Sequence, residues 1–358
     1  MRYNGHVTNP AKQHHGRGAA SNPTNRFVSV SSERFEDYDP SEDPSPRTQF
    51  IADASATVIN YNDSPDIPFT ASINVYRGCE HGCAYCYARP FHEFLGYSPG
   101  LDFETKIVVK YNAPELLRAE LASPKWKPQT IAMSGVTDCY QPAERKLQLT
   151  RRVLEVLLEF RNPVGIVTKN FLVTRDSDLL SQLAKFDCAM VFISITTLDP
   201  ELTQKLEPRA SLPKMRLAAI KKLREAGVPV GVMAAPMIPG LNDHEMPAIL
   251  KAAAEAGAQT AGCIPLRLPF AVKDIFSDWL TRHFPDRKEN VLNRLRSLRG
   301  GKLNDANFGS RMEGQGVWAE QLQQMFEVAT RKAGLNQCDI ELSTTHFRHP
   351  GGQQLSLI

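Results

Sequence analysis

The sequence has no long uncharged apolar run and little excess of charge of either sign. No stretch is long and apolar enough to span a bilayer, and the opening residues, MRYNGHVTNPAKQHHGRG, lack the apolar segment of a secretory signal. Lysine and arginine number 42 against 39 aspartates and glutamates, a net charge of +3 that neither requires nor excludes a polyanionic partner. We therefore expect a cytoplasmic protein with no membrane association.

Cysteine is also scarce, and its pattern does not suggest disulfides. Seven thiols, an odd number, fit a reducing compartment, where cysteines more often serve metals or catalysis. No C-x2-C spacing occurs among the four scattered residues Cys139, Cys188, Cys263 and Cys338. Isolated cysteines are usually small buried hydrophobes, so we predict no auxiliary cluster from these four.

The first 50 residues have few apolar side chains, whereas the chain beyond them alternates between strand and helix patterns. The composition of residues 1–50 predicts a disordered segment. Residues 51–270 contain six strand-then-helix units, with strands expected near residues 72–76, 130–135, 164–169, 189–196, 228–236 and 259–268. A long helix is expected to begin at Pro142. Such units predict an α/β fold, a partial (β/α)6 TIM-like barrel, with an open doubly wound sheet as the alternative. Residues 271–358 predict a helical C-terminal extension with an extended tail.

The remaining three thiols lie together in NVYRGCEHGCAYCYARP, residues 74–90. Cys79, Cys83 and Cys86 have the spacing C-x3-C-x2-C directly after the first expected barrel strand. Three thiolates from one loop hold three irons of a [4Fe–4S] cluster and leave the fourth iron open to another ligand. A structural zinc site completed by His81 or His92 is the serious alternative, and a disulfide with one spare thiol is a weaker one. The position of the loop favours the cluster, because active sites gather where strands of such folds end.

The motif CEHGCAYC resembles the signature of the radical S-adenosylmethionine (SAM) superfamily. The later segments SGVTDCYQPAE, VTK and FISI look like the branch related to spore photoproduct lyase, a DNA repair enzyme, and the resemblance covers about residues 70–270. It implies that the open iron binds SAM, that reductive cleavage gives a 5′-deoxyadenosyl radical, and that this radical abstracts hydrogen from a substrate. It also implies an electron donor such as a flavodoxin or a ferredoxin.

The resemblance assigns further residues. Cys79, Cys83 and Cys86 match the cluster ligands, and the cofactor-contacting positions are matched by Tyr85, Thr137, Lys169, Ser194 and Ala235. Arg267 is added from the strand pattern alone, because Ile264, Leu266 and Leu268 alternate with it and an arginine inside a barrel needs an anion. Ordinary cross-strand hydrogen bonding of Ser194 and a structural ion pair of Arg267 are the plainer interpretations.

The chain departs from this branch at its hydrogen donor. Spore photoproduct lyase uses a cysteine after the second strand, where Gly135 stands here. Cys139, four residues further on, and Tyr87, a phenol beside the third cluster cysteine, are the candidate catalytic residues in its place. Cys139 as a plain packing residue is the alternative.

The substrate is not specified by these patterns. Residues 282–302 hold seven Lys/Arg against two Asp/Glu, which suggests a nucleic-acid substrate or, alternatively, only a solvated helix face. We therefore expect a radical SAM enzyme, of a lyase or nucleic-acid-modifying type. The competing hypothesis is a non-catalytic zinc- or iron–sulfur-binding module on a barrel scaffold.

Overall fold

Six parallel strands and one antiparallel strand form the main sheet. The computed structural model describes residues 14–28 and 46–350. The strand order is β10-β9-β8-β7-β6-β3-β2, and only β2 runs antiparallel to its neighbour. The strands are β2 (Ile59–Tyr61), β3 (Ala71–Ile73), β6 (Ile131–Met133), β7 (Val164–Thr168), β8 (Ala189–Ser194), β9 (Val230–Met237) and β10 (Thr260–Pro265). All six predicted barrel strands are present, and because β2 and β10 do not pair with each other the sheet stays open, as expected of a partial (β/α)6 barrel.

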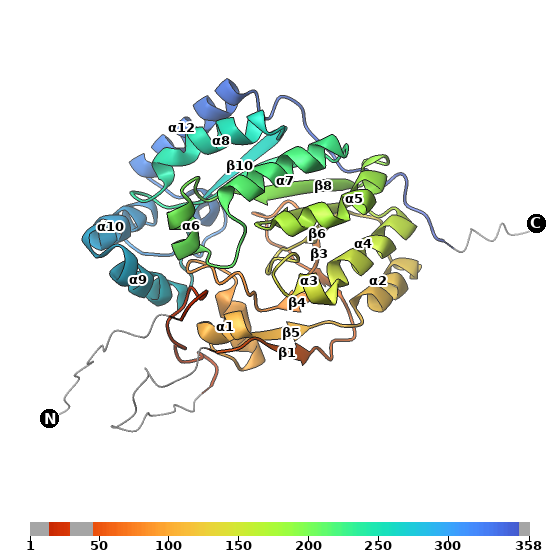
Figure 1. Cartoon of the computed structure of the whole chain (residues 1–358), viewed down its shortest axis with the longest axis horizontal. Helices are drawn as coiled ribbons and strands as arrows, with labels where there is room; N and C mark the ends of the chain where they lie inside the picture. The colour runs from red at the N-terminus through yellow and green to blue at the C-terminus, as the bar shows by residue number, and fades with distance from the viewer. Residues whose placement is uncertain (1–13, 29–45, 351–358) are drawn as a thin grey trace, which may run out of the picture.

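Helices cover the outer face of this sheet, and a small second sheet lies beside the cysteine loop. Figure 1 shows α4, α5, α7 and α8 side by side along one face of the strands. The covering helices are α2 (Ala113–Ala122), α4 (Leu149–Phe160), α5 (Ser177–Ala184), α7 (Pro213–Glu225) and α8 (Met246–Glu255). The second sheet has the order β1-β5-β4, from β1 (Gln49–Ala52), β5 (Lys106–Val109) and β4 (Tyr76–Arg77). Shorter helices are α1 (Leu101–Thr105), α3 (Glu144–Leu147), α6 (Pro200–Leu206) and the 3-10 turns η1 (Arg89–Leu95), η2 (Phe171–Asp176), η3 (Asp243–Glu245) and η4 (Pro285–Arg287).

The strand alternation read from the sequence is reproduced in the core. Val191, Ile193 and Ile195 of the β8 segment are buried with the helix layer in the principal apolar cluster. The hydroxyl of Ser194 donates instead to the carbonyl of Ala235 at 3.0 Å, and that of Thr196 lies 3.0 Å from the same carbonyl. The helix side of the sheet is therefore aliphatic, whereas polar groups gather at the strand ends.

The helix expected to begin at Pro142 is interrupted. Gln148 has a φ of 51°, so the chain forms the short helix α3, breaks, and starts again as α4 at Leu149. A left-handed residue stops the i→i−4 hydrogen bonding of a helix, and glutamine adopts this conformation only where its surroundings impose it. Glu144 stabilises this conformation. Its buried carboxylate accepts a hydrogen bond from the N–H of Thr150, beyond the break, at 3.0 Å.

The expected disorder of residues 1–50 does not hold for residues 14–28, which we call the strap. Ala19 and Asn25 within it are buried, and the strap packs against the segment that follows the cysteines. Burial against the rest of the chain compensates for the few apolar side chains of the strap itself. Residues 46–50 are described as well and lead into β1, whereas the remainder of the predicted disordered segment lies outside the described residues.

The C-terminal extension is helical, as predicted, and packs on two sides of the barrel. Helix α12 lies along α8, while α9 and α10 share a second apolar cluster with α6 (Figure 1). These helices are α9 (Val272–His283), α10 (Lys288–Leu298), α11 (Ser310–Glu313) and α12 (Val317–Ala333). Among the described residues, no helix is long and apolar enough to cross a bilayer. The division into segments 1–50, 51–270 and 271–358 stays a prediction.

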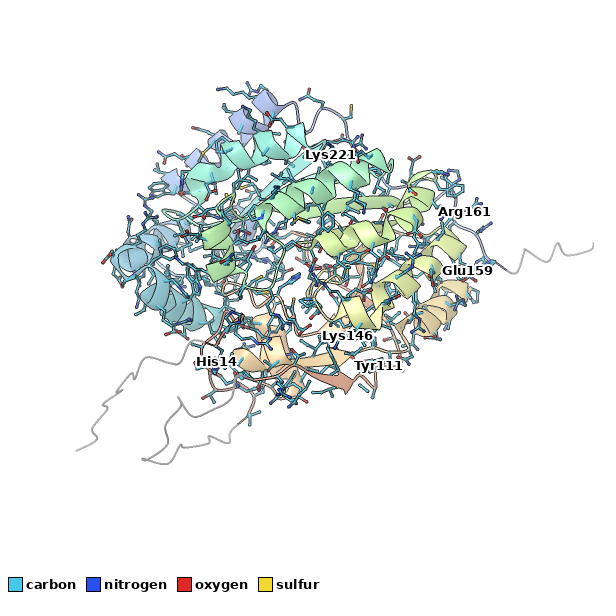
Figure 2. All side chains as sticks on the ribbon, viewed as in Figure 1. His14, Tyr111, Lys146, Glu159, Arg161 and Lys221 are labelled. Carbon is cyan, nitrogen blue, oxygen red and sulfur yellow. The ribbon has the colours of Figure 1, made fainter. Side chains whose placement is uncertain are left out.

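The residues after α12 form no regular secondary structure up to residue 350, in keeping with the expected tail. Asn336 attaches to the free edge of β10: its side-chain oxygen accepts from the N–H of Ala261 at 2.7 Å, and its amide nitrogen donates to the Ala261 carbonyl at 3.1 Å. Further on, the N–H of Arg348 donates to the carbonyl of Phe160 at 2.9 Å. Figure 2 shows Glu159 and Arg161 at this end of α4.

Candidate functional site

The three clustered cysteines lie in one loop between β4 and η1, and none is paired in a disulfide. Cys79 and Cys83 are buried and Cys86 is partly buried. The loop is fixed by main-chain contacts: the N–H of Cys79 donates to the carbonyl of Phe103 at 2.8 Å, and that of Ala84 to Leu206 at 3.0 Å. Burial raises the pKa of all three thiols.

The donor set around these thiols is open rather than closed. Among the described residues, no three His, Cys, Asp or Glu side chains are grouped closely enough to hold a single metal ion. Both ring nitrogens of His81 have other partners, Asn170 Nδ2 at 3.1 Å and Asp138 Oδ2 at 3.4 Å. His92 packs edge-on against Phe103, and burial lowers its pKa to about 4. With both of its ring nitrogens held by other partners, His81 is poorly available to complete a four-ligand zinc site, which favours a cluster that draws three ligands from the protein.

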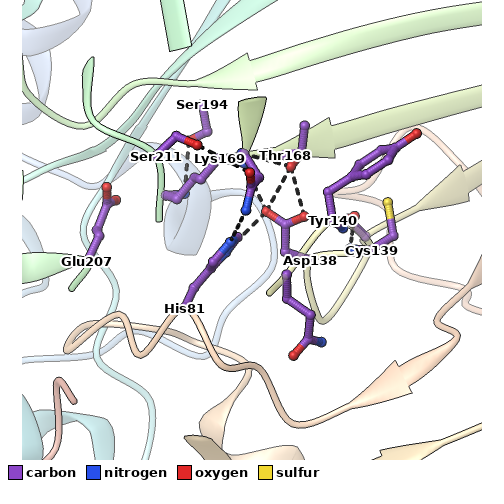
Figure 3. Close-up of polar contacts among 12 residues, drawn as sticks. His81, Asp138, Cys139, Tyr140, Thr168, Lys169, Ser194, Glu207 and Ser211 are labelled. Carbon is purple, nitrogen blue, oxygen red and sulfur yellow. Dashed lines mark hydrogen bonds and ion pairs between the residues drawn. The ribbon is translucent and has the colours of Figure 1, made fainter. Parts of the chain in front are cut away.

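Asp138 connects two strand ends with the cysteine loop (Figure 3). Its carboxylate accepts from the Thr168 hydroxyl at 2.8 and 3.0 Å and from the N–H of Lys169 at 2.9 Å. The same carboxylate faces His81. Asp138 was not among the predicted site residues, although the motif SGVTD contains it; the available signal was a carboxylate directly after a barrel strand.

Lys169, Ser194 and Ala235 form a polar row across the ends of β7, β8 and β9. The Lys169 ammonium donates to Ser194 Oγ at 2.9 Å, and Ser194 Oγ donates onward to the Ala235 carbonyl at 3.0 Å. The ammonium lies 6.0 Å from the ring centroid of Tyr85 in the cysteine loop. Among the described residues Lys169 forms no ion pair, so it retains the capacity to bind an anion. Four of the residues predicted to bind the cofactor are thus brought together.

Behind this row, Glu207 forms the centre of a buried network. It accepts from the hydroxyls of Tyr85 and Thr196, the latter at 2.6 Å, and pairs with Arg216. Burial alone would raise the pKa of Glu207, but Arg216 and Lys169 hold it down at about 2, so the carboxylate is ionised. Arg216 was not predicted as a site residue, because it lies on α7, which reads as an ordinary amphipathic helix.

The other predicted residues border the same region in different ways. Thr137 is buried, and its hydroxyl donates to the Tyr76 carbonyl at 2.5 Å. The hydrogen of this hydroxyl is therefore already used in a main-chain contact. Tyr87 is 41% exposed, and its hydroxyl donates to the Gly135 carbonyl at 2.8 Å. Arg267 lies over the Tyr87 ring, 5.3 Å from its centroid, and forms no ion pair with any described residue. The anion that Arg267 was expected to need is therefore not supplied by a described side chain.

Cys139 lies deeper than Tyr87. It belongs to the principal apolar cluster, and its main chain is held by Ser134 and Thr150 at 2.9 and 2.6 Å. Figure 3 shows it beside Tyr140, on the far side of Asp138 from His81. This placement is that of a packing residue and favours Tyr87 of the two candidate hydrogen donors.

Comparison with known proteins identifies the family of this arrangement. The family described as the radical SAM superfamily matches residues 73–253, half of the chain and the part that carries the thiols and the polar row. An uncharacterized protein of Mycobacterium tuberculosis is 38% identical over 234 residues, covering 65% of this chain and 68% of its own length. An uncharacterized protein of Methanocaldococcus jannaschii is 35% identical over 173 residues, covering 48% and 62%.

Solved structures of spore photoproduct lyase share the fold. One aligns with a TM-score of 0.59 at 16% identity over 80% of each chain, and another, with bound AdoMet and dinucleoside spore photoproduct, gives the same TM-score. At this level of identity the likeness shows the fold alone, a partial barrel of the radical SAM type.

Proposed function

The chain belongs to the radical SAM superfamily, and we propose that it is an enzyme that binds a [4Fe–4S] cluster on Cys79, Cys83 and Cys86 and cleaves SAM reductively. The observation that carries this is the set of three free thiols in one loop, two buried and one partly buried, next to a polar row whose lysine forms no ion pair. When bound and reduced, the cluster supplies the electron that splits SAM, and the radical formed takes hydrogen from the substrate. An external one-electron donor such as a flavodoxin or a ferredoxin completes the proposal.

The residues of the polar row are proposed to bind SAM. Lys169 and Arg267 form no direct ion pair with a described carboxylate, and each suits the carboxylate of SAM or an anionic group of the substrate. Tyr85 offers its ring on the cysteine loop, held in place through Glu207. Ser194 and the Ala235 carbonyl provide neighbouring polar contacts, and Thr137 fixes the main chain of its loop.

The direct test is anaerobic purification followed by incubation with dithionite and SAM. The proposal expects a brown protein with about four irons per chain and formation of 5′-deoxyadenosine. Colourless protein that carries one zinc ion would contradict it and support the alternative of a metal-binding module.

We further propose a nucleic acid as the substrate, bound at a different surface from the one predicted. Within residues 282–302, Arg299 is buried and bound to the Leu266 carbonyl at 3.1 Å, and Arg294 stacks on Trp318. These arginines are therefore poorly placed for phosphate. A second exposed surface is aromatic and consists of Arg26, Phe27, Phe94 and Phe270.

The rings of this surface are arranged as stacking platforms. Phe27, Phe94 and Phe270 are 58, 69 and 56% exposed, and the Arg26 guanidinium lies 3.7 Å from the Phe270 ring centroid. Exposed rings beside arginine are typical of sites that bind single-stranded nucleic acid, where each stacked base contributes about 1–3 kcal/mol. Phe94 belongs to η1, which starts three residues after Cys86, and we propose that a strand bound at this surface reaches the proposed cluster.

Removal of two of these rings is expected to weaken nucleic-acid binding. Phe27→Ala combined with Phe94→Ala should raise the Kd for a fluorescent single-stranded DNA at least about tenfold, because two stacking contacts are lost. The measurement is fluorescence anisotropy at fixed salt. Tyr111→Ala, which removes an exposed ring from another part of the surface, is the control and should leave Kd unchanged (Figure 2). Equal Kd values for all three proteins would remove this surface from the proposal.

Tyr87 is proposed to act beside the reacting atoms, as the exposed phenol directly after Cys86. Tyr87→Phe should preserve formation of 5′-deoxyadenosine but lower the ratio of product to 5′-deoxyadenosine, because the radical forms normally and the later hydrogen donation fails. Cys139→Ala should leave that ratio unchanged, since the thiol lies in the apolar core. Quantifying both compounds by mass spectrometry after turnover checks this, and the reverse pattern would assign the donor role to Cys139.

A further inference from the structure

The strap runs directly over the cysteine loop, and two glycines make the contact. A Cβ atom on Gly18 of the strap would lie 1.8 Å from the carbonyl oxygen of Gly82, between the first two cysteines. A Cβ atom on Gly82 would lie 2.8 Å from a carboxylate oxygen of Glu104. The two backbones therefore approach so closely that neither position accepts a side chain without displacement.

Two fully buried side chains join the strap to the loop. Glu104 accepts from the N–H groups of Gly18 and Ala19 at 3.1 and 2.9 Å. The same carboxylate pairs with Arg89 at 2.5 Å, and both side chains are 0% exposed. Arg89 in turn donates twice to the carbonyl of Cys83, at 3.0 and 2.8 Å. A continuous path of hydrogen bonds thus leads from the strap main chain to the second cysteine.

Further contacts hold the strap along its length. Ala19 packs with Leu101 of α1 and Ile275 of α9. At the far end, Arg26 pairs with Glu93 at 2.7 Å. Figure 2 shows His14, at the beginning of the strap, beside α1. The partners of the strap therefore include the segment that follows the cysteines and the helices next to it.

We propose that residues 14–28 are part of the cluster-binding unit and limit access of solvent and oxygen to it. Glu104 and Arg89 are positioning residues: they touch no substrate, but they fix the Cys83 main chain and anchor the strap over the loop. This inference rests on the proposed function, because it requires the cluster. Binding and ordering are reciprocal, so if the strap retains the cluster, the cluster must also stabilise the strap.

The first test compares two glycine substitutions in the full-length, iron-loaded protein. Gly18→Ala should shorten the half-life of the iron–sulfur absorbance in air several-fold and lower iron retention during gel filtration. Gly165→Ala is the matched control, because no atom lies within 4 Å of its added Cβ. Urea unfolding of the iron-free proteins separates a local effect from general destabilisation, since Gly18→Ala should shift the cluster half-life far more than the unfolding midpoint. Equal half-lives for Gly18→Ala and the wild type would overturn the inference.

The second test needs no variant and decides the question if Gly18→Ala folds poorly. Hydrogen exchange measured by mass spectrometry should show peptides from residues 14–28 exchanging faster in iron-free than in iron-loaded wild type, because the strap loses its partner. Identical exchange in the two forms would contradict the inference while leaving the radical function intact. A wild-type protein that binds no iron would instead contradict the proposed function itself.

Discussion

Cys83→Ala is expected to abolish iron loading and 5′-deoxyadenosine formation together. Three thiolates are the smallest set that holds the proposed cluster, and no described carboxylate or imidazole is grouped with them to replace one. Arg89 also donates two hydrogen bonds to the carbonyl of Cys83. The main chain there is therefore fixed, and the loop cannot readily move to bring in another ligand. Iron analysis and the absorption spectrum of anaerobically purified protein measure the first effect, and chromatography of the reaction with dithionite and SAM measures the second.

A cysteine outside the loop provides the control for this experiment. Cys188 is buried in the principal core, and its thiol donates only to main-chain carbonyls, such as that of Phe186 at 3.2 Å. Cys188→Ala should therefore keep its iron and its cofactor cleavage, at a modest cost in stability. Wild-type iron content in Cys83→Ala would disprove the assignment of the loop as a cluster site.

Glu207→Gln is expected to produce the largest loss of stability among the site substitutions. Arg216 is 1% exposed and Glu207 is its ion-pair partner, so the substitution leaves a buried guanidinium without its counter-charge. Breaking one side of such a pair typically costs about 3–5 kcal/mol. It also replaces the charged acceptor of Tyr85 by a neutral amide oxygen, which accepts more weakly, so SAM binding should weaken along with folding. Urea unfolding of the iron-free protein measures the free energy of unfolding, and equilibrium dialysis of the loaded protein measures SAM affinity.

Two further variants show whether the lost charge causes the loss of stability in Glu207→Gln. Glu225→Gln removes a carboxylate from an exposed pair with Lys221, at 4.0 Å, and should change the unfolding free energy by less than about 1 kcal/mol. Adding Arg216→Met to Glu207→Gln removes the unpaired charge and should recover part of the lost stability. If the double variant instead has a clearly lower free energy of unfolding than Glu207→Gln, the unpaired charge of Arg216 is not the cause of the lost stability.

The sequence was informative where residue pattern and strand order coincide. The alternation around Ser194 predicted both its aliphatic and its polar neighbours, and strand ends in a parallel array gather at one edge, so Lys169, Ser194 and Ala235 were expected near one another. The cysteine spacing singled out the loop for the same local reason. What these features share is that each is encoded within a few consecutive residues.

The missed features depend on particular side-chain contacts that the helix and strand patterns do not contain. Arg216 and Glu207 meet because α7 packs behind the site, and nothing in either local sequence announces the pair. The strap was read as disordered because its composition is polar, yet its main-chain N–H groups bind Glu104, more than 80 residues away. The break at Gln148 was missed because glutamine is normally a good helix former. Composition and periodicity contain no information on such individual side-chain contacts.

The side chain of Asn336 bears on how far this protein can be shortened. A barrel that stops at six strands leaves β10 with unpaired main-chain groups, and such edges readily add a strand from another molecule. The side-chain amide of Asn336 takes the place of a neighbouring strand at Ala261, because it accepts from the N–H of Ala261 and donates to its carbonyl. The residues after α12 are thus an edge protector rather than a dispensable terminus. A protein truncated after Gly334 would expose the edge of β10 and should aggregate more readily, even though every residue of the proposed site would remain.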